Sequence, residues 1–114
     1  SKSMAKYTDT PVWNSKLSKK MWELYLKDSK PDEFASPALA QDFKRMPKTY
    51  IETAEYDSLH DEGVEYANKL KASHIDVELF NTIGTMHGFD MAAKSKIVIE
   101  SVGRRTDFLR RCFR

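Results

Sequence analysis

The sequence has little of several things that often define a protein class. Its 114 residues include one cysteine, four glycines and four prolines. Cys112 alone cannot form a disulfide within the chain, and no cluster of cysteine and histidine has zinc spacing, so we expect a cytoplasmic location and no metal site. No segment approaches the ~18 consecutive apolar residues of a membrane-spanning helix, and the N-terminus lacks the basic and then apolar pattern of a signal segment. Stable membrane insertion is therefore not expected.

What the sequence does have is material for one compact fold. Hydrophobic residues make up 40% and charged residues 32%, which favours a water-exposed globular domain, or part of one, over disorder. The net charge of +2 is uneven, because residues 104–114 hold five arginines and one aspartate. Cations near the end of a helix are favoured by its dipole. We therefore interpret the basic tail as a solvated final helix and expect no nucleic-acid partner.

The first half of the chain predicts one helix between two irregular segments. Residues 1–14 show no sustained periodicity and are expected to form an irregular lead-in that Trp13 anchors. Residues 15–27 carry apolar side chains at helical spacing with lysines on the other face, which predicts a helix. Residues 28–48 contain three prolines and are expected to form a connecting loop.

The second half, residues 49–114, predicts strand, helix, strand and helix in that order. Residues 49–54 form a β-branched and aromatic run of strand length, and residues 77–80 alternate between apolar and polar as a second strand. An amphipathic helix is expected between them, from about residue 58 to 73. This arrangement is a right-handed crossover between parallel strands, so the fold class is α/β.

A final helix is expected from residue 91 to about residue 112, with Gly103 as a candidate interruption. Its inward stripe is expected to consist of Ile97, Val98, Val102, Leu109 and Phe113. Two parallel strands leave at least one edge unpaired and, with the helices available, one face uncovered, whereas parallel sheets are normally buried on both faces. We therefore expect the chain to form part of a larger sheet.

Two side chains are candidates for chemistry because of the strands they follow. His87 lies in a loop with Gly84 and Gly88, just after the second strand, at the edge where reacting groups collect in α/β sheets. Asp57 follows the first strand at the same edge, and neighbouring strands lie only ~4.8 Å apart. An aspartate that binds one imidazole nitrogen fixes the tautomer and stabilises the imidazolium, so the pair is a candidate general base with its orienting acid. Alternatively, Asp57 only caps the following helix, and His87 has a structural role.

Other parts of a catalytic site are missing from the sequence. No glycine flanks a serine in the G-x-S-x-G pattern of a nucleophile elbow, and no glycine-rich oxyanion segment is present. No phosphate loop, dinucleotide fingerprint or metal-spaced carboxylate pair occurs, so no cofactor is expected. We interpret Cys112 as a packing residue and His60 and His74 as surface residues.

Three segments of the sequence resemble one protein family. They are Ala35-Ser36-Pro37 with Leu39-Ala40, the stretch PKTYIETAEYDSLHDEG from Pro47 to Gly63, and Gly84-Thr85-Met86-His87-Gly88-Phe89. Together they resemble the C-terminal third of the α/β-hydrolases related to hormone-sensitive lipase. Two positions depart from the family pattern, because Ser58 replaces the usual proline after the acid and Lys48 replaces a frequent second proline.

The resemblance implies a partial α/β-hydrolase fold that holds the last two parallel strands with their flanking helices. It implies that Asp57 is the triad acid and His87 the triad base of a carboxylesterase or lipase acting on short acyl esters. In such relatives the nucleophilic serine and the oxyanion segment lie upstream. Because the chain starts at Ser1, with Met4 as its first methionine, we expect a fragment or a processed product. We expect it to be almost inert by itself, since a general base without a nucleophile or oxyanion donors cannot form an acyl-enzyme.

Two other interpretations stay open. An oligopeptidase-type serine hydrolase also ends in strand, aspartate, helix, strand and histidine, although Ser36-Pro37 and Asp61-Glu62-Gly63 favour the esterase branch. A non-catalytic interaction module would keep the half-fold and use its bare strand edge to pair with another chain. In each case we expect self-association, since an open strand edge and an uncovered sheet face are adhesive.

Overall fold

Two parallel strands form the centre of the molecule. A computed structural model describes residues 1–113, and its strands are β1 (Thr49–Ala54) and β2 (Val77–Thr82). They pair in parallel, starting with Thr49 opposite Val77. Helix α3 (His60–Ala72) connects them, so the predicted α/β crossover is confirmed.

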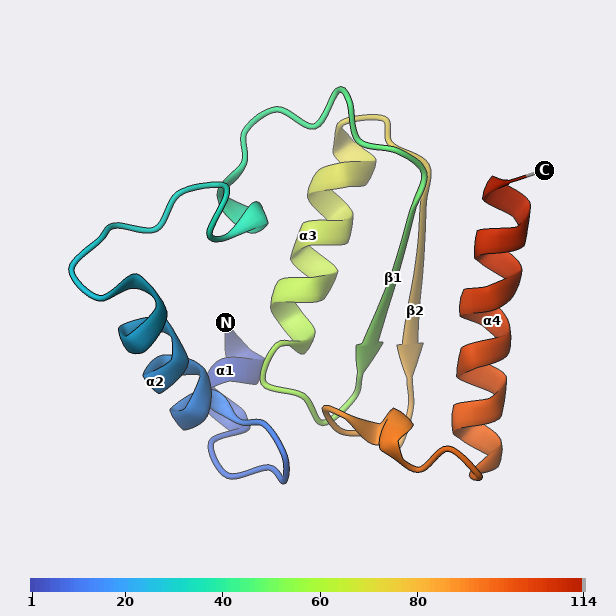
Figure 1. Ribbon diagram of the computed structural model, residues 1–114, viewed down its shortest axis with the longest axis horizontal. Coiled ribbons are helices and arrows are strands. Elements are labelled where there is room, and N and C mark those ends of the chain that lie inside the picture. The colour runs from blue at the N-terminus through green and yellow to red at the C-terminus, as the bar shows by residue number, and fades with distance from the viewer. Residues whose placement is uncertain (114) are drawn as a thin grey trace.

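Each face of the two-stranded sheet carries one helix. In Figure 1, α3 lies on one side of the strands and α4 (Lys96–Cys112) on the other. Successive side chains of β1 point to different helices: a Cβ on Gly63 of α3 would come within 2.8 Å of Thr53 Cγ2, whereas Ser101 of α4 hydrogen-bonds to Glu52. The expectation of an uncovered face is therefore wrong, because the final helix returns across the strands. Within residues 1–113, the outer edge of each strand is unpaired.

Helix α3 is anchored by small and apolar side chains. Ala67 and Leu70 on its inner side are fully enclosed. Acidic residues occupy its first turn and lysines its last turn, which suits the helix dipole. The helix gives way at His74, which is exposed, as expected, and has a left-handed φ of 63°. The helix thereby connects the end of β1 to the beginning of β2.

The first residues are helical rather than irregular. Helix α1 (Lys2–Lys6) begins at Ser1, whose side chain accepts a hydrogen bond from the backbone N–H of Met4. Ser3 joins this helix to the start of α3, because its N–H donates to Asp61 Oδ2 and its hydroxyl to the Ser58 carbonyl, both at 2.8 Å. A five-residue helix is too short for a detectable apolar period, and these tertiary hydrogen bonds stabilise it.

Helix α2 (Ser15–Leu26) ends one residue before the predicted end. Asn14 caps it, since its side chain accepts a hydrogen bond from the Leu17 N–H at 3.1 Å. The next loop contains one short 3-10 turn, η1 (Pro37–Leu39). Lys69 of α3 donates to the carbonyl of Ala38 at 3.0 Å, which ties the loop to the helix. In Figure 1, α2 stands apart from the two strands.

Helix α4 buries a different face from the predicted one. Val98, one of the five residues of the predicted stripe, is buried as expected, and so is Phe108, which was not part of the stripe. Four members of the predicted inward stripe are instead 36% to 86% exposed: Ile97, Val102, Leu109 and Phe113. The helix meets the sheet through Ser101 and its neighbouring arginines, because these bind the carboxylate of Glu52. The apolar period alone therefore misplaced the buried face.

Helix α4 also begins later than expected. Phe89–Met91 form a separate 3-10 turn, η2, and α4 starts only at Lys96. The helix continues through Gly103 without interruption and leaves Cys112 exposed, so the prediction of a packing cysteine is wrong. Among residues 1–113, no helix has both the length and the apolar character needed to cross a membrane.

Candidate active site

The loops that follow β1 and β2 bring Asp57 and His87 together. His87 Nδ1 lies 2.8 Å from Asp57 Oδ2, a hydrogen bond between groups 30 residues apart in the sequence. Asp57 is buried, whereas the imidazole side chain is 39% exposed. One nitrogen of the ring is thus held by a buried carboxylate, while the ring itself reaches the surface.

Hydrogen bonds from the start of α3 hold both the side chain and the backbone of Asp57. Its Oδ1 accepts a hydrogen bond from the Leu59 N–H at 2.9 Å, and its carbonyl accepts one from the His60 N–H at 3.1 Å. Asp57 therefore shapes the turn before α3, but Leu59, which makes no side-chain cap, occupies the cap position. Asp57 is therefore not the helix cap, because it lies two residues before the cap position, and its second oxygen binds His87.

This geometry sets the tautomer of a neutral His87. A carboxylate only accepts, so Nδ1 carries the proton and Nε2 keeps its lone pair. A lone pair at Nε2 can accept a proton from a hydroxyl, and the carboxylate then stabilises the imidazolium. The pair is therefore equipped for general-base chemistry at Nε2.

The backbone of the His87 loop depends on two glycines. Gly84 and Gly88 have backbone φ angles of 72° and 74°, which residues other than glycine rarely adopt. A Cβ on Gly88 would also lie 3.2 Å from Val12 and 3.3 Å from Met91. The loop reaches the Asp57 turn through a hydrogen bond at 2.8 Å from the Tyr56 N–H to the Thr85 carbonyl.

Trp13 is a contact of His87 that the sequence did not reveal. The two ring centres lie 5.8 Å apart with a tilt of 33°, so the indole covers part of the imidazole. The preceding residue, Val12, has a left-handed φ of 68°, which is rare for a β-branched side chain. The sequence indicated only that Trp13 anchors the lead-in, since no local pattern links residue 13 to residue 87.

Two hollows border His87. One has a volume of about 260 Å³ and is lined by Met86, Phe89 and Arg105, among others. The other has a volume of about 460 Å³ and is bordered by Asp57 and the η1 turn. A small substrate group therefore has room beside the imidazole.

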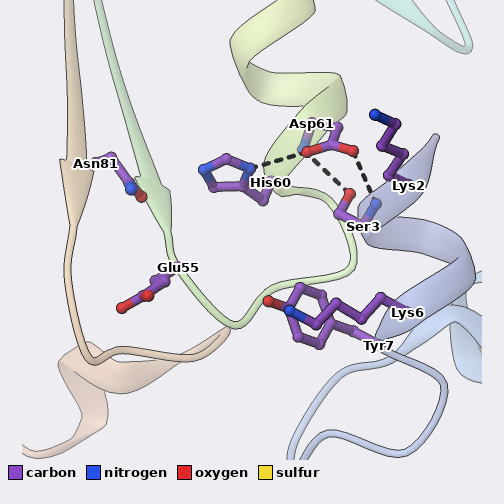
Figure 2. Close-up of a pocket in the computed structure, with 8 residues that line it drawn as sticks. All are labelled: Lys2, Ser3, Lys6, Tyr7, Glu55, His60, Asp61 and Asn81. Carbon is purple, nitrogen blue, oxygen red and sulfur yellow. Dashed lines mark hydrogen bonds and ion pairs between the residues drawn. The ribbon is translucent and has the colours of Figure 1, made fainter.

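A separate pocket beside α1 contains another serine, histidine and aspartate (Figure 2). His60 Nδ1 lies 3.0 Å from Asp61 Oδ1, and the His60 side chain is only 25% exposed, so this predicted surface histidine is partly buried. The hydrogen bonds from His60 and from the backbone of Ser3 lower the pKa of Asp61. The Ser3 hydroxyl donates to a backbone carbonyl and accepts from the Asp61 N–H, so these three residues form no catalytic relay.

A nucleophile for His87 is not found in the described part of the chain. Among residues 1–113, no serine or cysteine side chain hydrogen-bonds to the imidazole. The arrangement can orient a base and stabilise its charge, but it needs a hydroxyl and oxyanion donors to attack an ester.

Comparison with known families identifies the class of protein. The family described as alpha/beta hydrolase fold matches residues 1–91, which is most of the chain. The chain therefore belongs to this family, in the branch of esterases related to hormone-sensitive lipase.

Particular relatives are esterases. The chain is 35% identical over 69 residues to an arylesterase of Saccharolobus solfataricus and 37% identical over 71 residues to carboxylesterase NlhH of Mycobacterium tuberculosis. These matches cover 59% and 61% of this chain but 22% of each relative. The solved structure of a bacterial heroin esterase matches all of this chain with a TM-score of 0.94 and 32% identity, over 38% of its own length. The chain is thus a partial α/β-hydrolase fold.

Proposed function

We propose that Asp57 and His87 are the acid and base of a serine carboxylesterase. The observation that carries the proposal is the 2.8 Å hydrogen bond between His87 Nδ1 and Asp57 Oδ2, which leaves Nε2 available to a hydroxyl. The similarity to an arylesterase and a carboxylesterase supports an ester substrate rather than a peptide. The oligopeptidase alternative lacks such support.

The mechanism follows from the two ends of the imidazole. Nε2 of His87 takes the proton of a serine hydroxyl while the serine oxygen forms a bond to the ester carbonyl carbon. The imidazolium, stabilised by Asp57, then protonates the leaving alcohol as its bond to the acyl carbon breaks. In the second half, Nε2 takes a proton from water while the water oxygen forms a bond to the acyl carbon. The imidazolium then returns this proton to the serine oxygen as the bond between serine and the acyl carbon breaks, which releases the carboxylic acid.

The proposed substrates are esters with short acyl groups. The hollow of about 460 Å³ beside His87, lined in part by Pro37, Ala38 and Leu59, has room for a small apolar group. The serine and the oxyanion donors come from another part of the complete enzyme, so we propose that these 114 residues alone are almost inactive.

The test compares the 114-residue chain with a product extended upstream of its coding sequence. The extended product should hydrolyse p-nitrophenyl butyrate and react with a fluorophosphonate probe, whereas the shorter chain should do neither. In the extended product, His87→Ala should lower kcat by roughly 10⁶-fold and Asp57→Asn by roughly 10⁴-fold.

His74→Asn is the matched control, because His74 is exposed and asparagine tolerates its left-handed backbone. This variant should keep the activity of the parent. An upstream sequence without a G-x-S-x-G segment, or an esterase that survives His87→Ala, would contradict the proposal.

A further inference from the structure

Glu52 is a charged residue at a position where a buried strand normally has an apolar one. It lies in the middle of β1, and its side chain is only 7% exposed. It points to the face that α4 covers, and neighbouring Tyr50 on that face packs its ring 5.5 Å from the ring of Phe108. A carboxylate in such a place needs partners, because burial disfavours its charge.

The carboxylate of Glu52 has partners on both oxygens. Ser101 Oγ lies 2.7 Å and 2.8 Å from the two oxygens, and Thr82 Oγ1 donates to Oε1 at 2.8 Å. Arg104 Nη2 donates to Oε1 at 3.2 Å, and Arg105 Nε donates to Oε2 at 2.6 Å. Four side chains from β2 and α4 therefore converge on one carboxylate.

Arg105 extends this network toward the candidate active site. Its Nη1 donates to Asp90 Oδ2 at 3.0 Å, and Asp90 belongs to η2, three residues after His87. Glu52, Arg105 and Asp90 also line the hollow of about 260 Å³ that Asp57 and His87 border. The network and the candidate catalytic pair thus share one cavity.

Before His87 the loop is tied to the Asp57 turn, because the Tyr56 N–H donates to the Thr85 carbonyl at 2.8 Å and the Gly84 N–H donates to Glu55 Oε2 at 2.7 Å. After His87, on the side that faces α4, the segment has fewer anchors. Two glycines with left-handed φ flank it, and η2 is held locally by single-turn hydrogen bonds such as Met91 N–H to the Gly88 carbonyl at 3.1 Å. The contact from Arg105 to Asp90 fixes η2 to α4, and the Glu52 carboxylate in turn fixes the plane of the guanidinium.

We propose that Glu52 is a positioning residue that holds the His87 loop in register with Asp57 through Arg105 and Asp90. The proposal rests on the proposed function of Asp57 and His87. Stability alone is a weak reason for this network, because a buried ion pair can often be replaced by apolar side chains without loss. Charged hydrogen bonds are directional, so the chain from Glu52 through Arg105 to Asp90 can also hold the loop at one position.

The test measures the tautomer of His87 in the 114-residue chain. The ¹⁵N shifts of the ring nitrogens, detected through the carbon-bound protons, report which nitrogen carries the proton when the ring is neutral. His87→Gln identifies the signals, since His60 also lies beside a carboxylate. The wild-type chain should show mainly the Nδ1–H form.

Asp90→Asn is the decisive variant, because it weakens the final contact and leaves the Glu52 partners in place. It should raise the fraction of the Nε2–H form several-fold while the midpoint of thermal unfolding stays within about 2 °C of wild type. Glu52→Gln should raise the same fraction and also lower the midpoint. Asp107→Asn, which removes an exposed carboxylate of α4 that binds Arg110, should change neither.

An unchanged tautomer in Asp90→Asn would overturn the proposal, whatever the result for Glu52→Gln. If Glu52→Gln fails to fold, Asp90→Asn alone decides. In the extended esterase, Asp90→Asn should lower kcat with little change in KM. An extended product without esterase activity would refute the proposed function but leave the tautomer measurement intact, so the two failures are distinguishable.

Discussion

The indole ring of Trp13 lies 5.8 Å from the imidazole ring of His87, with 33° between the ring planes. This contact places the N-terminal segment directly on the candidate base. Pairs of aromatic rings in such arrangements contribute about 0.5 to 1.5 kcal/mol beyond their buried area. The lead-in segment is therefore part of the site.

A double-mutant cycle measures this contact. Trp13→Leu and His87→Ala should show a coupling of about 0.5 to 1.5 kcal/mol in the free energy of unfolding, determined by urea titration. Trp22 is the matched control, because its ring packs against Tyr25. Trp22→Leu combined with His87→Ala should be additive, and additivity for Trp13 as well would contradict the structure.

Two glycines should respond oppositely to the same substitution. Gly88→Ala should destabilise the chain by about 1 to 2 kcal/mol, because φ is 74° and the added Cβ would press on Val12. Gly103→Ala should stabilise it by about 0.5 to 1 kcal/mol, because Gly103 lies exposed inside α4 and a Cβ there meets no atom within 4 Å. Chemical denaturation measures the change in free energy of unfolding of each variant. A change of the same sign and size in both would refute the assigned backbone geometry.

The central unit of the fold could be predicted because its signals are local. The β-branched run at 49–54 and the helical period that follows it define the crossover, and parallel strands carry their following loops to one edge. The position of Asp57 near His87 follows from this topology. Their hydrogen bond at 2.8 Å then sets the tautomer of His87, which depends on the orientation of two side chains that no local sequence pattern determines.

Contacts that join distant segments could not be predicted in the same way. Helix α1 depends on Ser3 binding Asp61, and the buried side of α4 depends on polar partners of Glu52 rather than on an apolar stripe. Apolar periodicity cannot detect a helix face that is buried through charged hydrogen bonds. The cover of His87 by Trp13 has no local sequence signal for the same reason.

Self-association remains a prediction that concerns the edges of the sheet. The outer edges of β1 and β2 are unpaired within residues 1–113, and several apolar side chains of α2 and α4 are exposed. Both features favour contacts between chains. Sedimentation equilibrium should show oligomers that dissociate as the concentration falls by about 100-fold, whereas a constant mass of 13.2 kDa throughout would contradict this.

The network at Glu52 predicts a specific dependence of stability on pH. Burial raises the pKa of this carboxyl, but the hydrogen bonds from Ser101, Arg105, Thr82 and Arg104 outweigh burial and lower it to about 2. A carboxylate with a lowered pKa stabilises the fold fully above its unfolded value, near 4.5, and loses this contribution as the pH falls toward 2.

Wild-type chain and Glu52→Gln should therefore differ most in free energy of unfolding at neutral pH and converge as the pH falls to about 2. The loss between pH 6 and pH 2 that is specific to Glu52 should be on the order of 2 kcal/mol, after allowance for solvent screening. Glu78→Gln is the control, because Glu78 binds Arg111 at the surface and its contribution should shrink in high salt, whereas that of Glu52 should persist. Urea titrations at several pH values check both curves, and parallel curves for wild type and Glu52→Gln would contradict the network, because they would mean that folding does not change the pKa of Glu52.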